Sequence, residues 1–283
     1  MVKYCNASCK KKHRHKHKKD CEEHLRRAAE HAAELHDQKL FKQPPPEFGD
    51  CPICFLPLPI LSGGRDYYAC CGKVICSGCT HAPVYDNQGN KVVEKSCPFC
   101  RTPYPSSEEE MVKRYKKRVE MNDHIAISDL GSYYRDGLHG FPRDYVKALE
   151  LFHRAVELGY SKAYNGIGYA YNNGEGVEVD IKKAIHYFEL AAMGGDATAR
   201  YNLGVKEENA GNTERALRHY MIAIRSGYAY SLNNIKQMYT NGHATKDDYT
   251  TALQSYQAYL GEIKSAQRDE AALYDSDRFR RYY

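Results

Sequence analysis

The sequence predicts a mainly α protein in which a small cysteine-rich α+β module is followed by an α-helical repeat solenoid. Two observations lead to this fold class. Eight of the eleven cysteines lie between residues 51 and 100, in a stretch with many Gly and Pro residues. From about residue 123, a pattern of Leu-Gly, Tyr, Lys-Ala, Phe and Gly recurs with a period of about 32–37 residues.

Length and composition set the broad class. The 283 residues are enough for two or three domains, and 42% hydrophobic with 27% charged residues is ordinary for a folded soluble protein. No long apolar run predicts a membrane span, and no apolar segment follows the basic N-terminal stretch as it would in a secretory signal. We therefore expect a cytoplasmic or nuclear protein, where closely spaced cysteine pairs are usually metal ligands.

Composition changes divide the chain into six segments. Proline residues 44–46 end a helical stretch, and a Ser- and Glu-rich stretch follows the last cysteine, Cys100. The expected segments are 1–43 (a partial Cys/His motif and a helix), 44–50 (a proline linker), 51–103 (the cysteine-rich module), 104–122 (a linker helix), 123–264 (about four helical repeats) and 265–283 (a tail).

Two helices are predicted outside the repeats. Residues 21–42 lack Gly and Pro and place Leu25, Ala29, Ala32 and Leu35 on roughly one side. Residues 106–121 begin with serines and acids and end with basic residues, as a capped helix does.

The repeats align through Gly131, Gly168, Gly204 and Lys236. Such a period predicts antiparallel helix pairs stacked into a solenoid. We expect small residues at helix contacts and large apolar residues in the core: Gly168, Ala184, Ala191 and Ala192 in the first role, and Leu149, Phe152, Ile185 and Phe188 in the second. The array resembles the Sel-1-like repeat family, relatives of the tetratricopeptide repeat, which implies a protein-binding scaffold without catalysis of its own.

Tyrosines are frequent in the repeats, and two interpretations are open. They could line a peptide-binding groove, or they could be packing residues with a surface hydroxyl, which is the more common role. The candidates are Tyr133, Tyr134, Tyr169, Tyr171 and Tyr187.

The eight clustered cysteines form three Cys-x-x-Cys pairs and one adjacent pair, Cys70-Cys71. Zinc needs four donors in a tetrahedron, so eight thiolates are enough for two closed sites. Lys73 stands where a histidine donor is expected, and an ammonium group has no lone pair to give. Cys70 supplies the missing donor, and Gly72 permits the tight turn that follows.

This arrangement resembles the all-cysteine variant of the RING finger family, over residues 51–103. The cross-braced order of that family implies two zinc ions. It places Cys51, Cys54, Cys76 and Cys79 on one ion, and Cys70, Cys71, Cys97 and Cys100 on the other. His81 is the alternative donor if only one of the doubled cysteines binds metal. Lys73, Lys95 and Arg101 are candidates to offset the thiolate charge.

RING fingers recruit a ubiquitin-conjugating enzyme, and three positions carry the match. Ile53 lies between the first two ligands, Pro98 lies within the last pair, and Arg101 follows the last ligand. Each alone could be a packing or solvated residue; together they favour enzyme contact. One segment departs from the family: residues 80–96 predict a short helical turn and a hairpin in place of a longer helix.

The N-terminus closely resembles the second half of a MYND-type zinc finger, a protein-interaction module. The matching residues are Cys5, Cys9, His17 and Cys21. Each zinc site would have two of its four donors, so we expect two further cysteine pairs in frame before Met1. The basic residues 10–19 and the cluster 113–118 could also be solvated charged faces or nucleic-acid patches.

Three hypotheses follow. The first is a RING-type ubiquitin ligase, a ubiquitin-protein transferase that recruits a conjugating enzyme and binds a protein substrate or adaptor through its repeats. The second is a non-catalytic, zinc-stabilised interaction scaffold. The third, nucleic-acid binding, is the least supported, because no aromatic platform or reading helix accompanies the charge.

Overall fold

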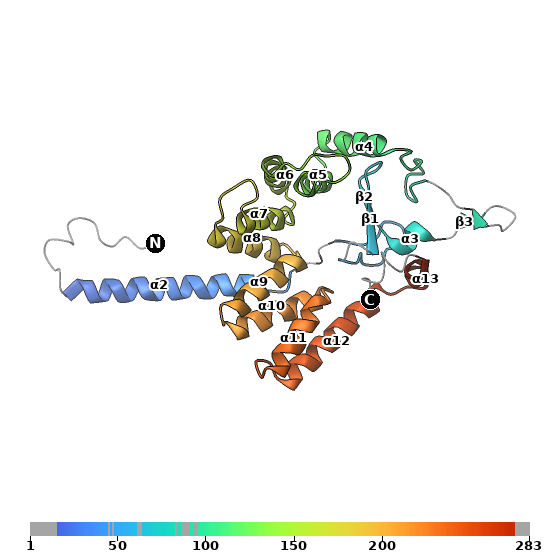
Figure 1. Cartoon of the computed structure of the whole chain (residues 1–283). Helices are drawn as coiled ribbons and strands as arrows, with labels where there is room; N and C mark the ends of the chain where they lie inside the picture. Colours follow the sequence, from blue (N-terminus) through green and yellow to red (C-terminus); the bar gives the residue numbers. More distant parts are fainter. Residues whose placement is uncertain are drawn as a thin grey trace. The chain divides into compact units, whose positions relative to one another are not determined.

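The structure is a computed structural model that describes residues 16–44, 46, 48–60, 64–82, 84–85, 91–92 and 96–274 (Figure 1). For residues 16–21, 84–85, 91–92 and 273–274 it describes the backbone alone. The chain splits into two compact units, Met1–Lys42 and Gln43–Tyr283. Each unit is described by itself below.

The first unit contains one long helix, α2 (Lys16–Leu40). Ion pairs one turn apart support it, with distances of 2.7 Å between Arg26 and Glu30 and 2.6 Å between Arg27 and Glu23. Leu25 on its predicted apolar side is 65% exposed. The helix ends before the proline run, as expected from the missing backbone donor of proline.

The second unit begins with the cysteine module, residues 51–103. Strands β1 (Arg65–Tyr68) and β2 (Lys73–Cys76) form an antiparallel hairpin in which Arg65 pairs with Cys76 and Tyr68 with Lys73. The short helix α3 (Ser77–His81) follows directly. Strands β3 (Val84–Tyr85) and β4 (Lys91–Val92) then pair antiparallel, as the predicted hairpin requires; the turn between them lies outside the described residues.

The core of this module is small. Among the described residues of the module, the buried members of this core besides the cysteines Cys51, Cys76, Cys79 and Cys97 are Leu58 and Ile75. A core of this kind gains much of its stability from a metal or a covalent link. The sulfur atoms therefore lie where a bound structural metal ion would stabilise the module.

Helix α4 (Glu108–Glu120) connects the module to the repeats, as predicted. The Ser107 side chain caps it by accepting a hydrogen bond from the backbone of Glu110. Three glutamates lie in its first turn and basic residues in its last, which suits the helix dipole.

The repeats form four helix pairs, α5–α6, α7–α8, α9–α10 and α11–α12 (Figure 1). An aspartate caps the N-terminus of four of these helices and marks each start in the sequence. Their bounds are α5 (His124–Asp136), α6 (Tyr145–Glu157), α7 (Ala163–Asn173), α8 (Ile181–Met193), α9 (Ala197–Asn209), α10 (Thr213–Arg225), α11 (Tyr230–Thr240) and α12 (Lys246–Ile263).

One contact recurs through the first three pairs: a glycine of the first helix faces an aromatic ring of the second. A Cβ atom on Gly131 or Gly168 would lie 2.9 Å from Phe152 or 2.6 Å from Phe188. Gly204 has the same relation to Tyr220, at 2.5 Å. The expected core residues Phe152 and Phe188 are buried, while Leu149 and Ile185 are half-buried. The small residue at this position therefore sets the helix separation.

The last helix, α13 (Ala266–Tyr274), lies in the segment 265–283 that sequence reasoning assigned to a tail. It packs against α3 of the cysteine module (Figure 1). Gly78 permits the close approach, because a Cβ there would lie 2.8 Å from Cγ of Arg268. The C-terminal end of the repeat array thus returns to the module.

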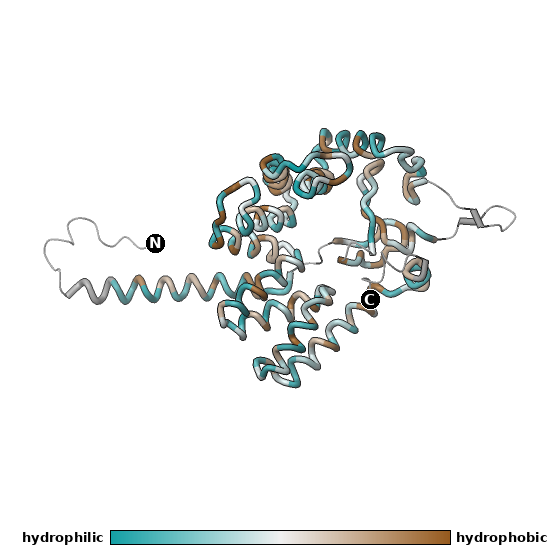
Figure 2. Tube along the Cα trace, in the orientation of Figure 1, coloured by the Kyte–Doolittle hydropathy of each residue, from teal (hydrophilic) through white to brown (hydrophobic). Residues whose placement is uncertain are grey.

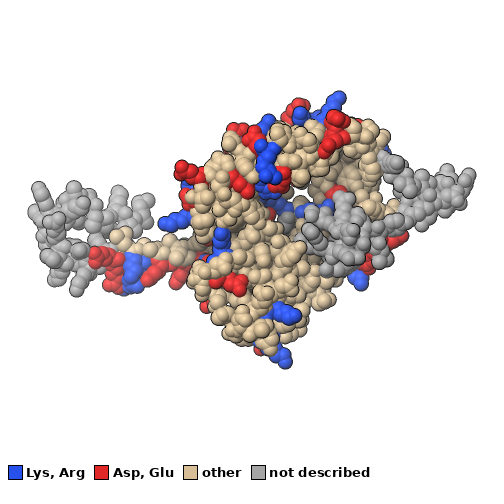
Figure 3. Space-filling view, in the orientation of Figure 1, with Lys and Arg blue, Asp and Glu red and all other residues tan. Residues whose placement is uncertain are grey.

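Apolar, polar and charged residues are interspersed over the described part of the chain (Figure 2 and Figure 3). Along the helices of the repeats, apolar and hydrophilic stretches alternate (Figure 2). On the face shown in Figure 3, acidic and basic side chains are interspersed over the described helices. Within the described part of the chain, no helix is both long enough and apolar enough to cross a bilayer.

Candidate metal centres

Two loops of the cysteine module have the same backbone structure, and each presents a Cys-x-x-Cys pair. In the first, the amide of Cys51 donates to the carbonyl of Leu56, and Phe55 donates back to Cys51, both at 2.9 Å. In the second, Cys97 donates to Thr102 at 2.8 Å and Arg101 donates to Cys97 at 2.9 Å. We call these the first knuckle (residues 50–57) and the second knuckle (residues 96–103).

The knuckles match in their backbone angles and edges as well. The residue after the second cysteine is left-handed in each, with φ of 59° at Phe55 and 62° at Arg101. A β-bridge closes each loop, between Asp50 and Pro57 and between Ser96 and Pro103. Non-glycine residues rarely adopt this conformation, and in both loops it occurs directly after a Cys-x-x-Cys pair.

The β1–β2 hairpin supplies the other four thiols. Cys70 and Cys71 lie in its turn, where the amides of Cys71 and Gly72 both donate to the carbonyl of Tyr68 at 3.2 and 2.7 Å. Gly72 has a φ of +70°, as expected for the tight turn. Cys76 and Cys79 lie at the other end of the hairpin, at the start of α3.

The fold gathers the thiols into two groups, each with all its sulfur atoms within 4.8 Å of one another. We call them the first and second cysteine groups. The first consists of Cys51, Cys54, Cys76 and Cys79, and the second of Cys70, Cys71, Cys97 and Cys100. These are the two sets implied by the cross-braced order, and neither includes the alternative donor His81.

The sulfur spacing fits a tetrahedral metal site. Zinc–sulfur bonds of about 2.3 Å place the sulfurs of a tetrahedron about 3.8 Å apart. The sulfur of Cys54 lies 3.7 Å from that of Cys76, and the sulfur of Cys71 lies 3.9 Å from that of Cys97. All eight are free thiols at distances far above a disulfide bond of about 2 Å. Both groups could therefore hold a metal ion.

The perturbed pKa values of the thiols within the groups also favour metal binding. A hydrogen bond from Cys76 lowers the pKa of the Cys51 thiol to about 4, and the same contact raises the pKa of Cys76. Burial raises the pKa of Cys79 to about 12 and that of Cys71 to about 11. A divalent cation that replaces these protons lets every thiol of a group ionise, so metal binding releases protons.

Arg268 is a cation that contacts the first group, and sequence reasoning missed it. Its Nη2 lies 3.7 Å from the sulfur of Cys54. Of the cations proposed from the sequence, Lys73 is exposed, with Nζ 5.8 Å from the centre of the Phe99 ring. Lys95 lies outside the described residues. The sequence gives no signal for Arg268, because it follows the last cysteine by more than a hundred residues.

Apolar side chains surround the knuckles on the outside. Ile53 is 37% exposed, Phe55 76% and Phe99 44%, and Pro98 beside Phe99 is half-buried. Large apolar groups held in solvent on a small module are typical of a protein-interaction site. The three positions that carry the RING match, Ile53, Pro98 and Arg101, all lie on these two loops.

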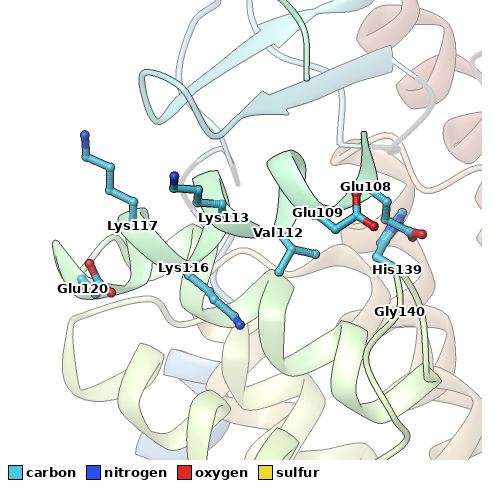
Figure 4. Close-up of a pocket in the computed structure, with 9 residues that line it drawn as sticks. All are labelled: Glu108, Glu109, Val112, Lys113, Lys116, Lys117, Glu120, His139 and Gly140. Carbon is cyan, nitrogen blue, oxygen red and sulfur yellow. The ribbon is translucent and has the colours of Figure 1, made fainter. Parts of the chain in front are cut away.

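The basic cluster 113–118 is divided in the structure. Arg114 and Arg118 bond to neighbouring segments, Arg114 to the carbonyl of Pro103 and Arg118 to Asp123. The other cations line a groove of about 830 Å³ together with glutamates and His139 (Figure 4). They are Lys113, Lys116 and Lys117. The cluster is thus divided between two side-chain contacts and a groove of mixed charge.

The MYND-like residues lie at the N-terminal edge of the described part of the chain or before it. Cys5 and Cys9 lie outside the described residues, and so do the side chains of His17 and Cys21 on α2.

Residues 124–160 and 161–196 match the Sel1 repeat. The chain carries Sel1 repeats. The two matched repeats coincide with the pairs α5–α6 and α7–α8, and the later pairs continue the same helical architecture.

The chain is also similar to longer proteins. The "ERAD-associated E3 ubiquitin-protein ligase component HRD3B" of Arabidopsis thaliana is 34% identical over 113 residues, 40% of this chain and 18% of that protein. "Chitin synthase regulatory factor 4" of Schizosaccharomyces pombe is 27% identical over 132 residues, 46% of this chain and 21% of that protein. The chain thus spans about a fifth of the length of these relatives.

Among solved structures, a Sel1 repeat protein from Oxalobacter formigenes is 31% identical. The alignment covers 56% of this chain and 65% of that protein, with a TM-score of 0.47.

Proposed function

We propose that this protein is a zinc-binding, RING-type ubiquitin ligase whose Sel1 repeats hold a protein substrate or adaptor. The observation that carries the zinc part is the gathering of eight free thiols into two groups with tetrahedral spacing. Closed tetrathiolate sites are structural, so the module would act by binding another protein. The cytoplasm and nucleus, whose reducing conditions keep such thiols free, are the proposed locations.

The ligase part is supported by the surface of the two knuckles. Ile53 would provide an apolar contact for a ubiquitin-conjugating enzyme, and Pro98 would border the same surface. Arg101, which is exposed, would orient ubiquitin for transfer. The module itself performs no bond chemistry in this scheme; it holds the thioester of another enzyme in a reactive position.

The repeats supply the second binding function. Helical repeats present long continuous surfaces to partners. A relative that is 34% identical over 113 residues is named as a component of an E3 ubiquitin ligase, which favours a role in ubiquitin transfer for this chain too.

Reconstituted ubiquitin discharge from a panel of charged conjugating enzymes tests the ligase proposal. We expect Ile53→Ala to abolish conjugating-enzyme binding while both metals remain. Arg101→Ala should leave binding nearly intact and slow discharge. Val146→Ala, which truncates a residue 57% exposed on α6, is the matched control and should change neither. A folded, metal-loaded protein that stimulates no conjugating enzyme would contradict the proposal.

In that case the second candidate is a zinc-stabilised scaffold without transfer activity. The observation that favours it is the short α3 of five residues followed by a hairpin. The RING family has a longer helix there, which adds an apolar contact to the conjugating enzyme. MYND-type zinc binding at the N-terminus stays a separate proposal, and nucleic acid is not a proposed partner.

A further inference from the structure

The two knuckles share a feature that links them to opposite ends of the repeat array. In each, the carbonyl of the proline three residues after the second cysteine accepts a hydrogen bond from an arginine of a flanking helix. Arg268 of α13 donates to Pro57 at 2.9 Å in the first knuckle. Arg114 of α4 donates to Pro103 at 2.7 Å in the second. One arginine comes from after the repeats and the other from before them.

Arg268 is the more deeply engaged of the two. Its side chain is buried, with the residue 1% exposed. Besides Pro57, Nη1 donates to the carbonyl of Ile263 at 2.7 Å, which anchors it to the end of α12. Nη2 reaches the carbonyl of Leu56 at 3.4 Å and the sulfur of Cys54 at 3.7 Å. A single guanidinium therefore joins the last repeat helix, the knuckle backbone and a candidate metal ligand.

The guanidinium of Arg268 lies beside the sulfur of Cys54, where a bound metal site would place negative charge. Zinc bound to four thiolates carries a net charge of about −2, which a guanidinium beside one sulfur would offset. Arg114 has its own carboxylate partner, Glu110, and no recorded contact with sulfur in the described part of the chain. The two arginines thus share a position but differ in their distance from the thiols.

We infer that Arg268 and Arg114 are positioning residues for the first and second metal centres, and that each metal fixes one end of the repeat array to the cysteine module. Metal binding would order the knuckle whose proline carbonyl receives the arginine, and docking of the helix would in turn stabilise the metal. This inference rests on the proposed zinc binding and is independent of ligase activity.

Metal release from the full-length, zinc-loaded chain tests it. The two release phases to a chromophoric chelator are first assigned with Cys79→Ser and Cys70→Ser, each of which disables one group. Removing a group that orients metal ligands usually costs about 10–100-fold in metal affinity. We expect Arg268→Met to release the first metal about ten-fold faster or more and to leave the second phase within about two-fold. Arg114→Met should accelerate the second phase alone, by less.

A spectroscopic measurement distinguishes this role from general loosening of the fold. In the cadmium-substituted protein, each tetrathiolate gives its own ¹¹³Cd resonance. Arg268→Met should shift the resonance of the first centre, because a hydrogen bond to Cys54 is lost, and Arg268→Lys should move it less. Hydrogen exchange should show α13 losing protection when the first metal is absent.

Three results would overturn the inference. One is equal acceleration of both phases in Arg268→Met, which would indicate general destabilisation. Another is an Arg268→Met protein with unchanged release and an unchanged resonance. The third is a wild-type chain without metal in the first group, which would also contradict the proposed zinc binding. Failure of ubiquitin discharge alone would contradict the ligase proposal and leave this one standing.

Discussion

The hydroxyl of Tyr67 donates a hydrogen bond of 2.8 Å to Oδ2 of Asp123, which joins the first strand of the cysteine module to the first repeat helix. The other oxygen of Asp123 accepts from the amides of Ile125 and Ala126 and caps α5. Arg118 completes the junction with an ion pair to Asp123 at 3.1 Å. One carboxylate thus serves as helix cap, ion-pair partner and docking site.

Removing the hydroxyl of this junction should weaken it measurably. We expect Tyr67→Phe to lower the free energy of unfolding by about 1 kcal/mol, the usual value for one hydrogen bond. Chemical denaturation of the metal-loaded chain measures it. Tyr239→Phe, at a tyrosine 41% exposed on α11, is the control and should be close to neutral. Equal effects of the two changes would contradict the docking role.

Gly72 lies beside Arg118 and Asp123 of the same junction. Replacing it, and comparing the result with a glycine in open space, distinguishes the cost of backbone strain from the cost of a steric clash. Gly72 and Gly140 have similar positive φ values of 70° and 73°. A Cβ on Gly72 would overlap the guanidinium of Arg118, whereas nothing lies within 4 Å of one on Gly140. We expect Gly140→Ala to cost about 1 kcal/mol for the left-handed backbone alone. Gly72→Ala should cost at least about 1 kcal/mol more in thermal or chemical unfolding; a cost no greater than that of Gly140→Ala would contradict the packing.

The glycine–ring contact of the repeats gives a second matched pair. Both Gly168 and Gly261 lie within helices, where alanine is favoured by up to about 1 kcal/mol. A Cβ on Gly261 meets nothing within 4 Å, and Gly261→Ala should therefore stabilise the protein. Gly168→Ala would press against Phe188, and we expect destabilisation of about 1–3 kcal/mol. Unfolding midpoints that move in the same direction for both variants would show that the ring contact does not set the helix separation.

Two aspartates of α5 should respond to pH with opposite signs. Burial raises the pKa of Asp129 to about 6, although Arg65 and Lys162 oppose the change. The folded state therefore holds this proton more tightly than the unfolded state, and stability falls as pH rises from about 4 to 6. Asp129→Asn should stabilise the protein at pH 7 by an amount on the order of 2 kcal/mol and have no effect near pH 4.

Asp136 is the control for this titration. Its hydrogen bonds from Arg135, both 2.8 Å long, lower the pKa of the carboxyl. Its contribution is therefore present at neutral pH and is lost as pH falls through the lowered pKa, so Asp136→Asn should destabilise at pH 7. Denaturation of each variant alongside the wild type at several pH values isolates the contribution of each carboxyl group to the free energy of unfolding. Destabilisation by Asp129→Asn at pH 7 would contradict the burial argument.

Metal removal should affect the cysteine module and helix α13, which packs on it, and leave the repeats largely folded. We expect two zinc ions per chain, and a chelator should abolish amide protection in residues 51–103 while most of the helical circular dichroism remains. Structural zinc supplies about 10–16 kcal/mol in small finger peptides, whereas the repeats have apolar cores of their own. Cys70→Ser should retain one ion. Metal analysis that finds a single ion in the wild type, or two in that variant, would refute the assignment.

The sequence by itself determined the features that depend on local spacing. Cys-x-x-Cys pairs define the knuckles, Gly72 makes possible the turn beside the doubled Cys70-Cys71, and the repeat pattern marks Gly168 as a helix-contact residue and Phe188 as a core residue. Each of these features depends on residues a few positions apart or within one repeat, where helix and turn geometry determine the contacts. The mainly α fold follows from the same periodicity.

Only the tertiary structure decided which distant side chains complete the site. Arg268 reaches Cys54 across more than two hundred residues, and α13 lies in a segment expected to be a tail. Arg114 and Arg118 looked like part of a solvated basic cluster until their partners Pro103 and Asp123 were placed beside them. Such contacts depend on how whole elements dock, through shape and through the need of buried charges for partners, and no local pattern in the sequence encodes that docking.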